Sequence, residues 1–316
     1  MHSIYAVLRV FVTMLQRFAQ AVLMYNWLMI NRIVKKAGEK ALKIDVAKLD
    51  PARLPGDVTE IFDIDYAGDG LSGHLLDVYF RKNGTKKPIL IDIHGGGFVS
   101  EDKAMNRMFG NYMAKAGFVV FELNVRLAYP EWTVFDQIED IDRGVRYVLD
   151  NAGSYECDKD RLYIAGHSSG GVLAVSEALL CVDPDMRRDF GIKDRNYSYK
   201  GVLTDCGLMH FYKSSIAYWG MRKMCFPKGY KNDKRYGYLV FERNESLKKL
   251  PKTVLITNPK DVLRKMTFHF DKVLESHGTE HSLFLYGKDG HTGIIFVPYS
   301  EQNMAVLKQI SDCFLN

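Results

Sequence analysis

A serine nucleophile is predicted at Ser168, in the stretch 166–170, which reads GHSSG. The apolar residues at 161–165 are typical of a buried strand, and a helical pattern begins at Ser169. A serine on such a sharp strand-to-helix turn needs glycine two residues to either side, because side chains there would clash with the strand and the helix. The pattern therefore predicts a serine that attacks acyl groups. The alternative is a glycine-rich loop around a buried serine.

A second glycine-rich stretch, HGGGF at 94–98, follows another apolar run. Attack of a serine on a carbonyl carbon creates an oxyanion, and consecutive glycines let backbone N–H groups approach it without side-chain obstruction. We expect Gly95, Gly96 and Ser169 to supply the amides of this oxyanion hole, and His94 to support the loop by a hydrogen bond. A flexible turn or a phosphate-binding loop is the alternative, but this stretch contains neither of the usual phosphate-loop glycine patterns.

An imidazole and a carboxylate that could activate the serine are predicted at His291 and Asp261. Each follows the end of a predicted strand, and the chain order is serine, acid, histidine. His291 would take the Ser168 proton and return it to the leaving group, while Asp261 would orient the imidazole. Asp289 is the alternative acid, but it lies only two residues from His291, too close for the usual geometry.

The elements that must position these residues alternate along the chain, as in a mostly parallel sheet covered by helices. Apolar runs rich in β-branched residues predict eight strands at 57–66, 74–80, 88–93, 118–124, 161–165, 200–204, 252–257 and 281–286. Helical patterns occur at 103–115, 135–150, 169–182, 265–276 and 301–314. The sequence therefore predicts the α/β class.

Composition narrows the class of protein further. A chain of 316 residues with 47% hydrophobic and 26% charged residues can bury the core of one large α/β domain. The net charge of +5 is spread along the chain, which argues against a nucleic-acid partner. The five cysteines form no C-x-x-C or Cys/His cluster, so we expect reduced thiols, no metal, no cofactor and a cytoplasmic location.

The N-terminal residues 1–50 are predicted to form an amphipathic helix and a segment that covers the substrate site, ahead of a catalytic domain at 51–316. The longest stretch without charge there, 18–31, has 14 residues, which is short of the roughly 20 that a membrane span needs. We expect no integral span. Packing over the protein's own cleft and contact with a membrane surface both remain open, as does a homodimer.

The 205–247 segment interrupts the alternation and is predicted to be an insertion that forms a helical cap over the strand ends. Its aromatic residues could line an acyl pocket, or they could form the core of the segment itself. We expect Phe98, His167 and Trp219 to contact the substrate. The aromatic and basic residues of the segment are Phe211, Tyr212, Tyr218, Trp219, Phe226, Tyr230, Tyr236 and Tyr238, with Lys213, Arg222, Lys223, Lys228, Lys231, Lys234 and Arg235.

Several of these motifs, in this order, resemble the hormone-sensitive-lipase family of bacterial esterases, from about residue 57 to the C-terminus. The matching stretches are 94–98, 125–131, 166–171, 261–263 and His291. The family usually has Asp and Ala beside the nucleophile, Tyr in place of Val125, and Gly-Phe after the histidine. Here His167 and Ser169 flank the serine, and Thr292 and Gly293 follow His291. None of these differences removes a group of the predicted triad.

The resemblance implies an α/β-hydrolase fold with an eight-stranded sheet, helices on both faces and a helical cap. It also implies a serine carboxylesterase that acts on small-molecule esters with short or medium acyl groups, without a cofactor. Hydrolysis of amides or peptides and acyl transfer to another acceptor remain open, since the same triad serves them. A catalytically silent relative that only binds a ligand is the alternative outside enzymes.

Overall fold

The computed structural model describes residues 49–315, which form one eight-stranded sheet in the order β1-β2-β4-β3-β5-β6-β7-β8. β2 pairs antiparallel with β1 and β4, and the six strands β4, β3, β5, β6, β7 and β8 run parallel to one another. The strands are β1 Thr59–Asp65, β2 Leu75–Phe80, β3 Lys87–Ile93, β4 Val119–Leu123, β5 Cys157–His167, β6 Gly201–Asp205, β7 Lys252–Thr257 and β8 His281–Leu285. Each overlaps a predicted strand, so the predicted fold class is confirmed.

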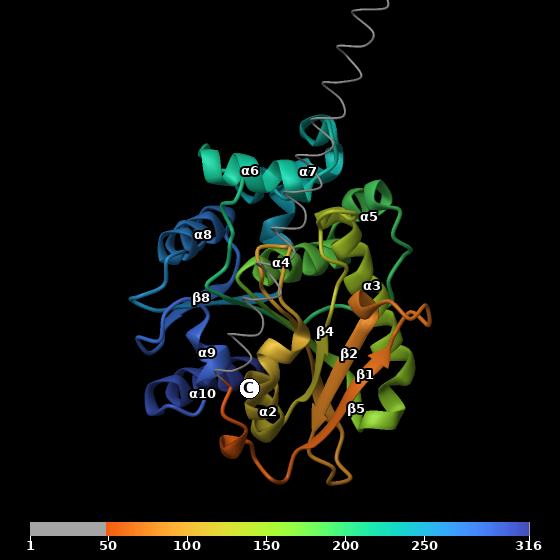
Figure 1. Ribbon diagram of the computed structural model, residues 1–316, viewed down its shortest axis with the longest axis vertical. Helices are drawn as coiled ribbons and strands as arrows, with labels where there is room; N and C mark the ends of the chain where they lie inside the picture. The colour runs from red at the N-terminus through yellow and green to blue at the C-terminus, as the bar shows by residue number, and fades with distance from the viewer. Residues whose placement is uncertain (1–48, 316) are drawn as a thin grey trace, which may run out of the picture.

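Helices cover both faces of the sheet (Figure 1). α3, α4 and α8 contribute to the hydrophobic core on one face, and α2, α9 and α10 contribute to the core on the other. Ile89 and Ile91 of β3 belong to the first core and Leu90 to the second, the two-residue period of a strand buried on both sides. The α-helices are α2 Arg107–Ala116, α3 Val134–Asn151, α4 Ser169–Val182, α5 Pro184–Phe190, α6 Ile216–Cys225, α7 Lys234–Tyr238, α8 Arg264–His277, α9 Gly293–Phe296 and α10 Glu301–Leu315.

Short 3-10 helices occupy several of the connections. They are η1 Pro51–Arg53, η2 Ser72–His74, η3 Lys103–Asn106, η4 Ala152–Tyr155, η5 Tyr230–Asn232, η6 Phe241–Arg243 and η7 Glu245–Lys249. α3 shows how local sequence sets a helix end, because the Thr133 hydroxyl accepts from the Asp136 amide and the Asp136 carboxylate accepts from the Thr133 amide.

The 205–247 segment carries α6 and α7, which lie at the top of the molecule in Figure 1, apart from the helices that cover the sheet. Phe226 is buried and stacks on Phe211 at 5.8 Å between ring centroids, and Tyr236 meets Phe226 edge-on at 5.2 Å. Tyr230 packs against both Phe226 and Tyr236. Much of the aromatic content of the segment therefore builds its own core, which is one of the two alternatives left by the sequence.

The predicted N-terminal amphipathic helix falls in residues 1–48, outside the described residues. Within 49–315, no helix is both long enough and apolar enough to cross a membrane.

Candidate active site

Ser168 lies on a sharp turn between β5 and α4 with the unusual backbone angles φ 54° and ψ −116°. A side chain at Gly166 would overlap the backbone of Gly170, and one at Gly170 would overlap the carbonyl oxygens of Ile93 and His94. Glycine is therefore required at both places by close approach of the neighbouring backbone. The turn holds a non-glycine residue in a strained conformation, which the surrounding chain must stabilise.

The end of β6 and the residues after it provide that stabilisation through the backbone of Ser168. Its amide donates to the carbonyl oxygen of Asp205, the last residue of β6, at 2.8 Å. Its carbonyl oxygen accepts from the amide of Leu208 at 2.9 Å. The serine is thus attached to the start of the 205–247 segment as well as to its own strand.

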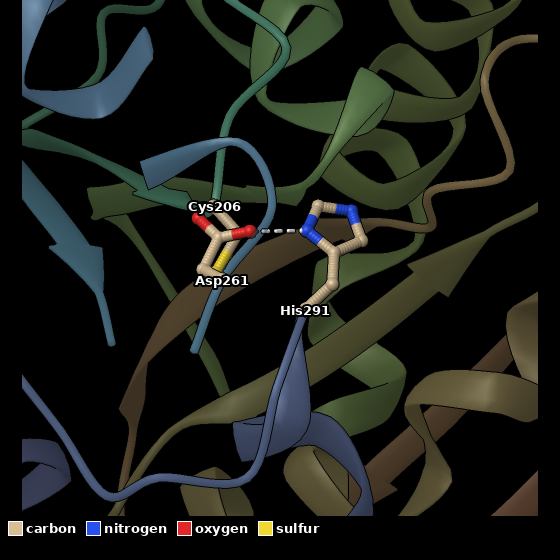
Figure 2. Close-up of side chains that lie close together, drawn as sticks. All are labelled: Cys206, Asp261 and His291. Atoms are coloured by element: carbon tan, nitrogen blue, oxygen red, sulfur yellow. Dashed lines mark hydrogen bonds and ion pairs between the residues drawn. The ribbon is translucent and has the colours of Figure 1, made fainter. Parts of the chain in front are cut away.

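Three side chains from separate strand ends form a hydrogen-bonded relay. His291 Nε2 lies 2.9 Å from Ser168 Oγ, and His291 Nδ1 lies 2.7 Å from Asp261 Oδ1. Asp261 also accepts from the Thr257 hydroxyl at 2.8 Å and from the Leu263 amide at 2.9 Å. Figure 2 shows the Asp261 carboxylate pointing at the imidazole of His291. The structure therefore brings together the three residues that the sequence predicted.

The carboxylate at the end of the relay is set up to stay ionised. The Asp261 side chain is 0% exposed, whereas His291 is 31% exposed. Burial alone would raise the pKa of Asp261, but hydrogen bonds from His291, the Leu263 amide and Thr257 outweigh it and lower that pKa. A buried carboxylate next to a partly open imidazole can stabilise an imidazolium while the ring still reaches a substrate.

The loop that carries His291 is held by its own contacts. These contacts also show whether Asp289 or Asp261 is the carboxylate partner of the imidazole. Gly290 has φ 88°, a left-handed conformation that favours glycine, and its carbonyl oxygen accepts from the side-chain amide of Asn258 at 2.6 Å. Asp289 accepts instead from the side-chain amide of Asn303 at 3.0 Å. Asp289 is thus engaged with α10, and Asp261 is the carboxylate that contacts His291.

The glycine-rich loop lies against the serine. A Cβ added at Gly95 would come within 3.2 Å of the Ser168 Cβ, and one at Gly96, where φ is 90°, would overlap the backbone of Ser100. The Phe98 amide donates to Ser169 Oγ at 3.1 Å, which joins this loop to the start of α4. Gly95 therefore lies beside the nucleophile, and Ser169 directly follows it in the chain. Gly96 shapes the turn that keeps the loop there.

The stretch 125–131 supports this loop from behind. The Phe98 carbonyl oxygen accepts from the Ala128 amide at 2.8 Å and from the Gln137 side chain at 2.9 Å. His94, as predicted, contacts its own loop, with Nδ1 3.1 Å from the Gly95 carbonyl oxygen. These bonds fix the backbone of the loop before any substrate arrives.

Comparison with known proteins decides the fold. Esterase B from Lactobacillus rhamnosis superposes with a TM-score of 0.79 at 23% identity, covering 90% of this chain and 93% of that chain. A hyperthermophilic esterase from Pyrobaculum calidifontis gives a TM-score of 0.69 at 21% identity, covering 90% and 96%. The chain has the α/β-hydrolase fold.

Sequence similarity to known proteins covers less of the chain than the structural similarity does. The BD-FAE family model matches residues 76–223. A probable isoprenylcysteine alpha-carbonyl methylesterase of Oryza sativa subsp. japonica is 24% identical over 251 residues, which are 69% of this chain and 54% of that relative. The esterase LipQ of Mycobacterium tuberculosis is 30% identical over 158 residues, 47% of this chain and 37% of its own. The chain thus spans about half or less of the length of these curated relatives.

His167 has a different place in this α/β-hydrolase from the one predicted. Its side chain is 0% exposed, and its two ring nitrogens lie 2.9 Å from Asp205 and 3.1 Å from Asp92. Burial by itself would lower the pKa of His167, but the two carboxylates raise it to about 10. The prediction that His167 contacts substrate is therefore wrong, because the ring has neither a free nitrogen nor an open face.

The other two residues predicted to contact the substrate, Phe98 and Trp219, differ in their exposure to solvent. Phe98 is 1% exposed and packs edge-on against Phe211 at 5.8 Å, so the structure offers no open face of its ring to a substrate. Trp219 on α6 is 54% exposed, with Lys223 Nζ 5.9 Å from its ring centroid. Phe98 is thus a core residue that anchors the 205–247 segment. Trp219 stays a prediction.

Cys206 lies next to the relay, although it was not among the residues predicted for the site. Its sulfur, a carboxylate oxygen of Asp261 and a ring nitrogen of His291 all lie within 4.8 Å of one another, and Figure 2 shows the thiol beside the Asp261 carboxylate. Burial raises the pKa of the Cys206 thiol, which contacts the Tyr286 hydroxyl at 3.2 Å. A protonated, buried thiol is no competitor for Ser168. Its position directly after β6 was the signal that could have found it.

Proposed function

We propose that this chain is a serine carboxylesterase that hydrolyses small-molecule esters through an acyl-enzyme intermediate. The observation that carries the proposal is the relay from Ser168 Oγ to His291 Nε2 at 2.9 Å and from His291 Nδ1 to Asp261 at 2.7 Å. A relay of this kind serves acyl transfer on several unrelated folds. The names of relatives and structural neighbours, which include several esterases, support the same reaction class.

The steps follow from the groups present. His291 accepts the Ser168 proton as the oxygen attacks the ester carbonyl, and the ring then gives that proton to the departing alcohol. Water attacks the acyl-serine in the same way, with His291 again as the base. Asp261 stabilises the imidazolium and holds its tautomer. We assign the oxyanion to the amides of Gly95, Gly96 and Ser169.

Short and medium acyl groups, including acetyl and aryl esters, are the proposed substrates, in line with the resemblance to hormone-sensitive-lipase relatives. No metal or cofactor enters the proposed reaction, since serine, imidazole and backbone amides supply every group that it needs. Amide hydrolysis and acyl transfer to another acceptor use the same groups and stay as second candidates.

The remaining parts of the proposal concern organisation. We propose residues 51–316 as the catalytic domain, the 205–247 segment as a cap, and the N-terminal residues as a further cover of the site or a contact with a membrane surface. Five free thiols support a cytoplasmic setting.

The test is a series of p-nitrophenyl esters from acetyl upward, assayed beside matched amides and acylated sugars. We expect the short esters to turn over and Ser168→Ala to abolish that turnover. A fluorophosphonate probe should label the wild-type chain at Ser168 and leave the variant unlabelled. Unchanged turnover in Ser168→Ala would reject the proposal, and turnover of amides alone would replace esterase with amidase.

A further inference from the structure

Two histidines and a glutamate converge away from the relay. His210 lies beyond β6, Glu242 lies in η6, and His269 lies on α8, so three distant parts of the chain contribute. His269 Nε2 is 2.6 Å and His210 Nδ1 is 3.5 Å from the same oxygen of Glu242, Oε1. The two imidazole rings lie 4.2 Å apart between centroids. We call His210, Glu242 and His269 the His-Glu-His cluster.

We propose that the His-Glu-His cluster is a binding site for a divalent transition-metal ion of the zinc type. Two imidazole nitrogens and one carboxylate oxygen are a donor set that zinc takes in proteins, with a water molecule in the fourth position. One ligand atom from each residue lies within 4.8 Å of the other two. Three ligands of a tetrahedral zinc ion lie about 3.3 Å from one another, so small side-chain rotations bring all three to the ion.

The glutamate provides an independent indication of a missing partner. The Glu242 side chain is 28% exposed, but its Oε2 atom is buried and has no hydrogen-bond partner among the described residues, although Oε1 accepts from His269. A buried carboxylate oxygen without a partner is costly. A cation bound to Glu242 would replace the hydrogen bond from His269. Its positive charge would stabilise both oxygens of the carboxylate.

The orientation of the His210 ring is set by the rings around it. The ring lies 4.2 Å from the His269 ring between centroids. The His210 ring also packs against Tyr212 at 4.8 Å, which limits the orientations open to it.

The position of the cluster suggests what the ion does. His210 and Glu242 lie near the two ends of the 205–247 segment, while His269 belongs to the helix that follows the Asp261 loop. A metal there would tie both ends of the segment to α8. Leu208, two residues before His210, bonds to the backbone of Ser168, so the tie reaches the nucleophile turn without supplying a reacting group. We therefore expect the ion to stabilise the chain and leave the chemistry to the relay.

The experiment uses the full chain after treatment with a chelator, titrated with Zn²⁺ in a calorimeter. We expect one ion per chain, with the affinity at least tenfold lower in His210→Gln, His269→Gln and Glu242→Gln. His277→Gln is the matched control, because His277 lies on the same helix and its Nδ1 is within hydrogen-bonding distance of Val273 and Ser276 of that helix. It should bind like the wild type. Zn²⁺ should also raise the Tm of the wild type and not that of the three cluster variants.

Co²⁺ serves as a spectroscopic probe that separates this site from the thiol near the relay. We expect a visible d–d spectrum without a thiolate-to-cobalt charge-transfer band. A charge-transfer band that disappears in Cys206→Ser would move the ion to Cys206, Asp261 and His291 and overturn the proposal. Binding that is equal in the wild type and in the double variant His210→Gln/His269→Gln would overturn it too. Circular dichroism of each metal-free variant shows whether it is folded.

Discussion

Two histidines close to Ser168, one at the end of a strand and one on a loop, have similar partners and different environments. His291 meets one carboxylate and one serine and is 31% exposed. His167, the residue directly before the serine, meets two carboxylates and is 0% exposed. The His291 ring is partly open to solvent beside Ser168, whereas Asp92 and Asp205 enclose the His167 ring and raise its pKa to about 10. Environment, and not residue type or closeness to the nucleophile, separates the two roles.

The largest expected effect comes from removing the exposed imidazole. His291→Ala should lower kcat/KM for p-nitrophenyl acetate by a factor on the order of 10⁴ to 10⁶, because it removes the base that lies 2.9 Å from Ser168 Oγ. The Tm should change little, since the ring is partly open. Steady-state kinetics and thermal unfolding measure both. Substantial residual activity would show that another group serves as the base.

The carboxylate partner comes next. Asp261→Asn should lower kcat by about 10⁴-fold, because the amide would favour the wrong tautomer of His291. Asp289→Asn is the matched control, since Asp289 contacts Asn303 and not the imidazole. It should retain wild-type kcat. Equal losses in the two variants would reopen the choice of acid.

Removing the buried imidazole should act mainly on stability. His167→Gln leaves two buried carboxylates without a cation, which costs about 3 to 5 kcal/mol in the free energy of unfolding. His74→Gln is the matched control, because His74 is 1% exposed and bonds to Asp69 and Asp140, far from the serine in the sequence. Both should lose stability in urea unfolding. Only His167→Gln should also lower kcat, because its neighbour is the nucleophile.

The His167 ring and its two carboxylate partners also predict that stability depends on pH. The pKa of His167 is about 10 in the folded chain, above the usual value of about 6.5. A raised folded pKa means that its stabilisation is complete below about pH 6.5 and is lost as the pH rises through about 10. The difference in unfolding free energy between wild type and His167→Gln should therefore shrink from pH 6 to pH 10. A constant difference would mean that the ring is neutral.

The smallest expected effect tests the contact between the glycine-rich loop and α4. Ser169→Ala removes the hydroxyl that accepts from the Phe98 amide at 3.1 Å. We expect a loss of about 1 kcal/mol in stability and at most about a tenfold drop in kcat, because the backbone amide of residue 169 remains. Kinetics and urea unfolding of this variant measure the two effects. A drop as large as that of Asp261→Asn would mean that the hydroxyl itself contacts the reacting atoms.

Local patterns made much of the site predictable. A strand is recognised by its apolar run, and Gly166 and Gly170 are recognisable because a sharp turn excludes side chains at both places. Ser168, Asp261 and His291 each follow a strand. Because these strands are parallel, their carboxyl ends lie at the same end of the sheet and bring the three residues together. Burial is less predictable. His167 and Phe98 looked accessible from their motifs, but Asp92, Asp205 and Phe211 enclose them from distant parts of the chain.

The amino-acid sequence by itself determined the alternation of strands and helices and the turn at Ser168, because each depends on neighbours within a few positions. The order of the three relay residues is likewise given by the sequence alone. The tertiary structure alone decided which histidine stays open and that His210, Glu242 and His269 meet. Those facts depend on the order of strands in the sheet and on the packing of the 205–247 segment against α8. Contacts between residues far apart in the chain leave no periodic trace in the sequence.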